Sequence, residues 1–169
     1  MRKAIGLSFS VPAELEIVPG PARSSFHAVE RRNFNQLVGE LDLSVISPGL
    51  IMDRDGVLRE AAIRAADSFV AAPRAGYIAH MGEIELPGGV AWRAQAFMER
   101  GKDGRAPALP YQTVLAMGHP DLALPVALFI SIHSVEEQWA PATELLESLR
   151  FLGAAAARAR EAVVLPFTS

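Results

Sequence analysis

The side chains best suited to chemistry are four histidines and a set of scattered carboxylates. His27, His80, His119 and His133 show no H-x-x-x-H spacing, which would place two zinc ligands on one helix face. A small hydrolase or lyase that depends on histidine and carboxylates would use His80 and His119 as general bases, and it stays open as a second hypothesis. Surface or strand-end histidines are the simpler interpretation, so we expect no catalytic residue and no metal site.

Other catalytic and ligand-binding motifs are absent or incomplete. The chain has no cysteine, which excludes disulfides, thiolate metal sites and cysteine nucleophiles. It has neither the G-x-S-x-G turn of α/β-hydrolases nor a G-x-x-x-x-G-K-[ST] phosphate loop. Residues 53–56 resemble the start of a calcium loop, but Arg64 occupies the twelfth position, where glutamate is required. We therefore expect no cofactor.

Length and charge narrow the class of protein further. The chain has 169 residues and 50% hydrophobic residues, which is typical of one folded domain. The net charge of −3 provides no basic field and argues against nucleic-acid binding. After Arg2 and Lys3, Ser8 and Ser10 interrupt the apolar run that a signal peptide needs. No segment reaches the length of a membrane span, so we expect a soluble cytoplasmic protein without stable membrane anchoring.

The first half of the chain predicts strands followed by a helix. Ile5, Leu7, Phe9 and Val11 alternate with small or polar residues, as in a half-buried strand. A short strand is expected near residues 15–17, and two more at 24–30 and 40–47, joined by a polar hairpin loop at 31–36. Apolar residues at three- and four-residue spacing predict a helix over 58–72, which Pro73 ends.

The second half predicts a four-strand meander followed by helices. The strands are expected at 77–86, 90–99, 109–117 and 124–133, and short turns make them antiparallel neighbours. The last strand is apolar on both faces, so it should be central and covered by helices. A helix should begin near Ala140 with Pro141 in its first turn, packing through Ala142, Leu145, Leu146 and Leu149. A third short helix is expected over 154–164. The pattern predicts an α+β fold, an antiparallel sheet flanked by helices in an α/β/α sandwich.

A mixed apolar and polar surface is the strongest candidate for a binding site. Gln95 and Phe97 share one face of strand 90–99, and Phe129, Ser131 and His133 share one face of strand 124–133. If the two faces coincide, the five side chains would form a surface suited to a helix or peptide of a partner. The alternative is that helices of the same domain cover these faces.

The order of these elements resembles that of a known superfamily. The resemblance rests on four segments: Phe-Ser-Val-Pro at 9–12, the helix at 58–72, Leu-Pro-Gly-Gly-Val-Ala-Trp-Arg at 86–93 and Leu-Leu-Glu-Ser-Leu-Arg-Phe at 145–151. Over residues 6–152 the chain resembles the PsbP-like superfamily, in particular its bacterial DcrB-type members. The resemblance implies an antiparallel sheet between helices, usually without catalysis. Cytoplasmic members of this superfamily include Eag-type chaperones of type VI secretion effectors.

The resemblance and the residues together favour a binding protein over an enzyme. We expect a PsbP-like domain at 1–152 and a helical tail at 153–169, packed on the domain or extended. The expected function is a non-enzymatic chaperone or adaptor for an apolar segment, such as a helix, of another polypeptide such as a secreted effector. A third hypothesis is a structural subunit that forms a homodimer through a sheet edge or face.

Overall fold

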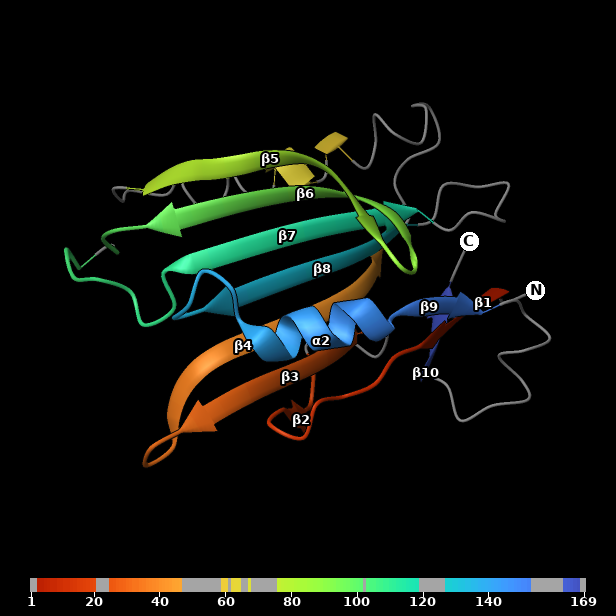
Figure 1. The fold of residues 1–169 in the computed structure, drawn as a ribbon, viewed down its shortest axis with the longest axis horizontal. Coiled ribbons are helices and arrows are strands. Elements are labelled where there is room, and N and C mark those ends of the chain that lie inside the picture. Colours follow the sequence, from red (N-terminus) through yellow and green to blue (C-terminus); the bar gives the residue numbers. More distant parts are fainter. Residues whose placement is uncertain are drawn as a thin grey trace.

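A seven-stranded antiparallel sheet forms the body of the molecule (Figure 1). The computed structural model describes residues 3–20, 25–46, 59–60, 62–64, 67, 76–101, 103–118, 127–152 and 163–167. The strand order in the large sheet is β2-β3-β4-β8-β7-β6-β5. The strands are β2 (Glu16–Val18), β3 (Ser25–Arg32), β4 (Gln36–Ile46), β5 (Gly76–Leu86), β6 (Gly89–Met98), β7 (Tyr111–Gly118) and β8 (Ala127–Ser134).

The predicted meander is confirmed as β5, β6, β7 and β8. Each strand pairs with the next in antiparallel register, and β8 then pairs with β4. β8 is therefore the middle strand of the seven, as its apolar residues on both faces predict.

The β3–β4 hairpin turns more tightly than the predicted loop. Only Asn33, Phe34 and Asn35 lie between the strands, with φ of 38°, 59° and 71°. Asparagine tolerates this left-handed region better than most residues, which accounts for two of the three positions. The ring of Phe34 at the tip is fully exposed.

A second, three-stranded sheet joins the two ends of the chain. β1 (Lys3–Ser8) lies between β10 (Val163–Phe167) and β9 (Arg150–Leu152), both antiparallel to it. Residues 154–162 of the predicted third helix lie outside the described residues. Val163 and Val164 belong to β10, so the last part of that helix prediction is wrong. Residues 163–167 form a strand because they pair with an edge of β1 that would otherwise have unpaired backbone groups.

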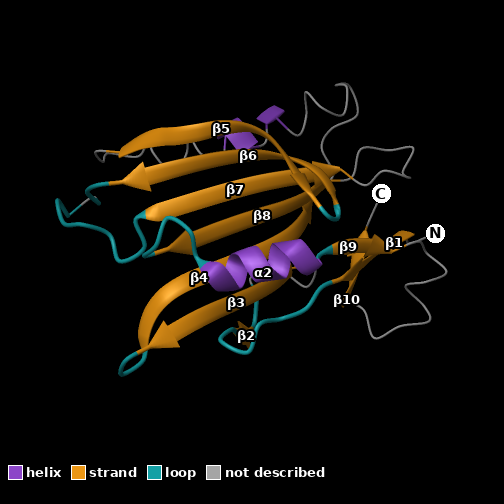
Figure 2. Cartoon of the chain, viewed as in Figure 1, coloured by secondary structure: helices purple, strands orange, loops and turns teal. Residues whose placement is uncertain are grey.

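Within the part of the chain that the structure describes, helices cover the sheet sparsely (Figure 2). α2 (Ala140–Ser148) packs on one face through Ala142 and Leu145, against a core that includes Leu41, Leu43 and Ile130. On the opposite face, helical residues 59–60, 62–64 and 67 bring Ala62 into a smaller cluster. The fold is therefore a sheet-dominated α+β fold, with less helical cover than the expected α/β/α sandwich.

The start of α2 agrees with the sequence prediction. The helix begins at Ala140, Pro141 occupies its first turn, and residues 135–138 are bends rather than helix. Proline lacks an N–H, and the first turn of a helix is where no intrahelical partner exists for that group. No helix in the described residues is long and apolar enough to cross a bilayer.

Candidate binding groove

The five residues of the predicted binding surface do not lie on one face. In the register, Gln95 lies opposite Thr113, and Thr113 lies opposite Ile132. Directly opposed residues project to the same face, and neighbours along a strand project to opposite faces. Gln95 and Phe97 therefore share the α2 face with Ile132, whereas Phe129, Ser131 and His133 point to the other face. The predicted surface required the two strand faces to coincide, and they do not coincide in this register.

The three β8 residues of that prediction have different surroundings. Phe129 packs against the cluster that contains Ala62, and Ser131 lies opposite Asp42 of β4. His133 Nδ1 lies 3.5 Å from Glu40 Oε1. Burial lowers the pKa of His133, and the nearby carboxylates of Glu40 and Asp42 oppose this effect only in part.

Gln95 lines a groove that runs beside α2. Its volume is about 450 Å³, within the usual range for ligand pockets. The sheet supplies the floor and α2 with its preceding loop supplies one wall. The apolar lining consists of Ile84, Leu86, Leu115, Ile132, Trp139, Ala142 and Leu146.

Three aromatic rings extend the groove along the sheet. The ring centroids of Tyr77 and Phe97 are 5.7 Å apart, and those of Phe97 and Tyr111 are 4.9 Å apart. The rings line a smaller pocket of about 90 Å³, which shares Gln95, Thr113 and Glu137 with the groove. Tyr77 is 53% exposed, so this row offers aromatic surface to solvent. Aromatic side chains are enriched where proteins bind one another.

A few polar groups lie among the apolar ones. Gln95 Nε2 donates a long hydrogen bond of 3.4 Å to Thr113 Oγ1. Arg93 on the floor and Glu137 and Glu147 on the α2 side also line the groove. Largely apolar walls with a few fixed polar groups can bind an apolar segment and select its orientation.

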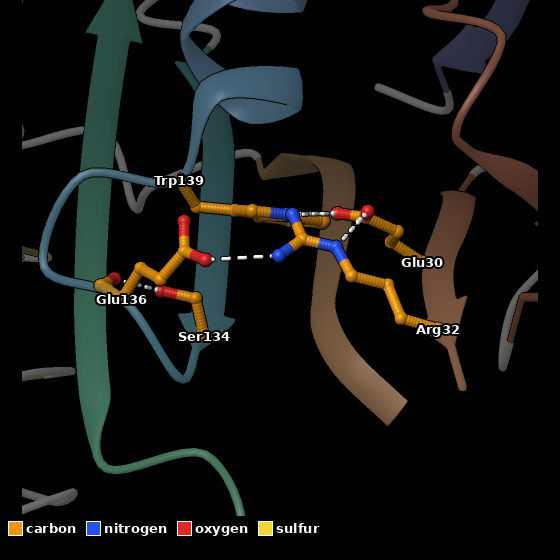
Figure 3. A network of polar contacts seen from close by, with 5 residues as sticks. All are labelled: Glu30, Arg32, Ser134, Glu136 and Trp139. Atoms are coloured by element: carbon orange, nitrogen blue, oxygen red, sulfur yellow. Dashed lines mark hydrogen bonds and ion pairs between the residues drawn. The ribbon is translucent and has the colours of Figure 1, made fainter. Parts of the chain in front are cut away.

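A network of hydrogen bonds and ion pairs around the buried Glu30 and Trp139 holds the wall of the groove in place (Figure 3). Trp139 Nε1 donates a 2.6 Å hydrogen bond to Glu30 Oε2, and Arg32 Nε donates a 2.6 Å hydrogen bond to Glu30 Oε1. Arg32 Nη1 also donates to Glu136, 3.0 Å away. The indole lies on Gly39, where any side chain would overlap it. The network thereby fixes the residue that precedes α2 against β3 and β4.

The same contacts determine the ionisation of Glu30. Burial favours the neutral acid, but the hydrogen bonds from Arg32 and Trp139 and the charge of Arg32 outweigh it. The pKa of Glu30 is therefore lowered from its ordinary value, and the carboxylate is ionised near neutral pH.

Of the two histidines that the sequence offered as general bases, the structure describes only His80. His80 is exposed on β5 opposite Gln95, and His119 lies outside the described residues. His27 Nδ1 lies 2.5 Å from Asp42 Oδ1 on the face opposite α2. Among the described residues no three histidine or carboxylate groups converge as metal ligands would. The possible calcium loop at 53–56 also lies outside the described residues.

Several residues of the groove were not identified from the sequence. Tyr77 and Tyr111 are partners of Phe97 across β5–β6 and β6–β7, so the meander alignment could have indicated them. Trp139 reaches the site from the loop before α2, and Leu146 reaches it from α2 itself. No strand periodicity indicates which part of a sheet a later helix will cover.

The fold is shared with solved structures of low sequence identity. LpqN, involved in cell envelope biogenesis of Mycobacterium tuberculosis, is similar with a TM-score of 0.60 and 13% identity, over 87% of this chain and 83% of that chain. A mutant of the protein Mog1 is similar with a TM-score of 0.54 and 11% identity, over 93% of this chain and 99% of that chain. No family model and no curated protein matches the sequence.

These similarities define a class of fold. The chain has a sheet-dominated α+β fold similar to those of LpqN and Mog1, in agreement with the kind of fold that the sequence resemblance implies. At these identities the similarity concerns the fold alone, because one fold can carry unrelated functions. The finer assignment to DcrB-type proteins or secretion chaperones stays a prediction.

Proposed function

We propose that the chain is a non-enzymatic binding protein whose groove holds an apolar segment of another polypeptide. The observation that carries this proposal is the uncovered part of the α2 face. There the groove and the row of Tyr77, Phe97 and Tyr111 form one continuous lining over β5, β6 and β7. A peptide can be held there by burial of its apolar side chains, at about 25 cal/mol per Å² before the costs of association.

Within this proposal we favour a chaperone or adaptor role for a segment of a secreted effector, as in type VI secretion. The support is the sequence resemblance to the cytoplasmic branch of the PsbP-like superfamily, together with the groove. A gene for an effector with apolar N-terminal segments beside the gene for this chain would strengthen the role. A structural homodimer is the competing occupant of the same surface, and it makes a different prediction for mass in solution.

Site-specific crosslinking tests the groove directly. A photoreactive phenylalanine analogue replaces Tyr77 in the full chain, expressed in its own host, and crosslinked products are identified by mass spectrometry. The matched control carries the analogue at Phe34, an exposed aromatic position at the β3–β4 turn. We expect one predominant polypeptide adduct from position 77 and none from position 34.

The substitution Phe97→Glu separates binding from folding. A charge in the aromatic row should abolish the adduct at position 77, while Phe34→Glu should leave it unchanged. Thermal stability should stay nearly intact because Phe97 is only partly buried. Unfolding by Phe97→Glu would mean that Phe97 is a core residue, and Tyr77→Glu, at a more exposed position, then supplies the binding test. An adduct that survives both substitutions, or one between two copies of the chain, would overturn the proposal.

A further inference from the structure

The floor of the groove carries a cation for which the described part of the chain provides no ion-pair partner. Arg93 lines the groove from the middle of β6, and its Nε is buried without a hydrogen-bond partner. The ion pairs among the described residues involve Arg31, Arg32, Arg64, His27 and His133, and none involves Arg93. A buried donor without an acceptor is costly and rare in native proteins, so it requires an explanation.

The surroundings of Arg93 leave room for an acceptor. Gly82 of β5 lies directly opposite Arg93, so no side chain extends from the β5 position opposite Arg93. The nearest atom to the place where a side chain on Gly82 would begin is His80 Nε2, at 3.9 Å. Gln95 follows on the same face of β6 and lies opposite His80. The position of Gly82 is therefore open apart from His80, and a group bound there would lie across from Arg93 and Gln95.

The charges of the groove are arranged across its width. Arg93 lies on the sheet floor, whereas Glu137 and Glu147 lie on the α2 side. The lining also continues past Arg93 in both directions along β6: Ile84 and Leu86 lie one way, and Gln95 and Phe97 the other. A bound segment can thus extend on both sides of the guanidinium, so the acceptor fits the interior of a segment better than its end.

We propose that Arg93 binds the carboxylate of a single internal aspartate or glutamate within the apolar segment that the groove holds. This inference rests on the proposed function and adds the chemistry of the partner. A planar guanidinium binds a carboxylate through two parallel hydrogen bonds, which fixes both position and direction. Apolar walls would hold the flanking side chains, and the carboxylates on the α2 side would disfavour a second acidic residue there.

Peptide selection on two versions of the full chain tests the inference. A displayed library of 16-residue peptides, rich in apolar residues and randomised at its central positions, is selected on wild type and on Arg93→Glu. We expect wild type to enrich Asp or Glu at one central position and Arg93→Glu to enrich Lys or Arg there. Arg93→Gln should weaken the best wild-type peptide by about 10- to 100-fold, the range for a charge-assisted hydrogen bond.

An internal competitor provides an independent test with the same peptide. Gly82→Asp places a carboxylate beside Arg93 and should weaken binding, whereas the matched variant Gly82→Asn should weaken it much less. The backbone at Gly82 is outside the left-handed region, so both side chains can be accommodated there.

The outcomes separate the two proposals. Selected peptides that bind in the groove and lose affinity with Phe97→Glu, yet show no acidic preference, would overturn the role of Arg93 and leave the proposed function standing. Peptides that keep the acidic preference on Arg93→Glu would also overturn the role of Arg93. Failure to select any groove-binding peptide would overturn both.

Discussion

The two halves of the α2 face differ in how deeply their side chains are buried, although they belong to the same sheet. Over β3, β4 and β8, which we call the covered half, Leu41, Leu43 and Ile130 are completely buried beneath α2. On β5, β6 and β7, Leu115 and Met117 still belong to the buried core. Farther along these strands, in the part that we call the open half, Gln95 and Phe97 are only partly buried and Tyr77 is more than half exposed. The strands of both halves alternate in the same way, so strand patterning does not account for the difference.

The size of the helix accounts for the difference. Seven strands about 4.8 Å apart span about 29 Å, whereas a helix with its side chains is about 10–12 Å across. One nine-residue helix, about 14 Å long, can therefore cover only part of the face. Figure 1 shows α2 in front of β3 and β4 and next to β8, with β7, β6 and β5 extending beyond it. The comparison teaches that the groove is the area that one short helix leaves uncovered.

The largest effect on stability should come from Leu145→Ala. Leu145 is fully buried between α2 and the covered half, so its loss should leave a cavity and lower the free energy of unfolding by about 2–5 kcal/mol. Urea unfolding followed by circular dichroism measures it.

The neighbouring leucine is the matched control. Leu146 is only partly buried and lines the groove, so Leu146→Ala should cost clearly less than Leu145→Ala. Equal losses for the two variants would contradict the division of the face, because they would mean that both halves are closed core.

Strand identity could be predicted from this sequence because it depends on local alternation. The meander, the central position of β8 and the start of α2 at Ala140 all follow from residues close together in the chain. The relation between strand faces could not be predicted, since it depends on register, and a shift by one residue reverses the face of every side chain. Gln95 and Ser131 were placed together for this reason, although they project to opposite faces.

The wall of the groove could not be predicted for a different reason. Glu30 and Trp139 are 109 positions apart, and their hydrogen bond forms only when α2 lies on β3 and β4. In the sequence, Glu30 looks like the polar end of a strand, yet it is 4% exposed in the fold. Hydrogen-bond partners of buried polar side chains can be identified only once the packing of the elements is known.

A smaller loss of stability, with a distinct pH dependence, is expected for Trp139→Phe. Phenylalanine keeps most of the apolar contact but removes the donor to Glu30, which should cost about 1–3 kcal/mol at neutral pH. The folded-state pKa of Glu30 is depressed, so its contribution is present above the unfolded-state pKa and is lost as pH falls through the folded-state value. Losing one of the hydrogen bonds that depress it should raise that pKa and move acid unfolding to higher pH.

The control for this prediction lies at the exposed edge of the network. Glu136 also accepts a hydrogen bond from Arg32, but both side chains are more than 40% exposed. Glu136→Gln should change stability by less than about 1 kcal/mol, because exposed ion pairs contribute little. An acid-unfolding midpoint that is identical for wild type and Trp139→Phe would show that the indole does not influence the ionisation of Glu30.

The smallest effect is expected for Gln95→Ala in the open half. The side chain donates one long hydrogen bond of 3.4 Å, to Thr113, and both residues are only partly buried. Water can replace this bond, so the free energy of unfolding should stay within about 0.5 kcal/mol of wild type. Because Gln95 lines both parts of the groove, the same variant should weaken any peptide selected there. A loss as large as that of Leu145→Ala would mean that the open half is as closed as the covered one, and the groove would then lose its physical basis.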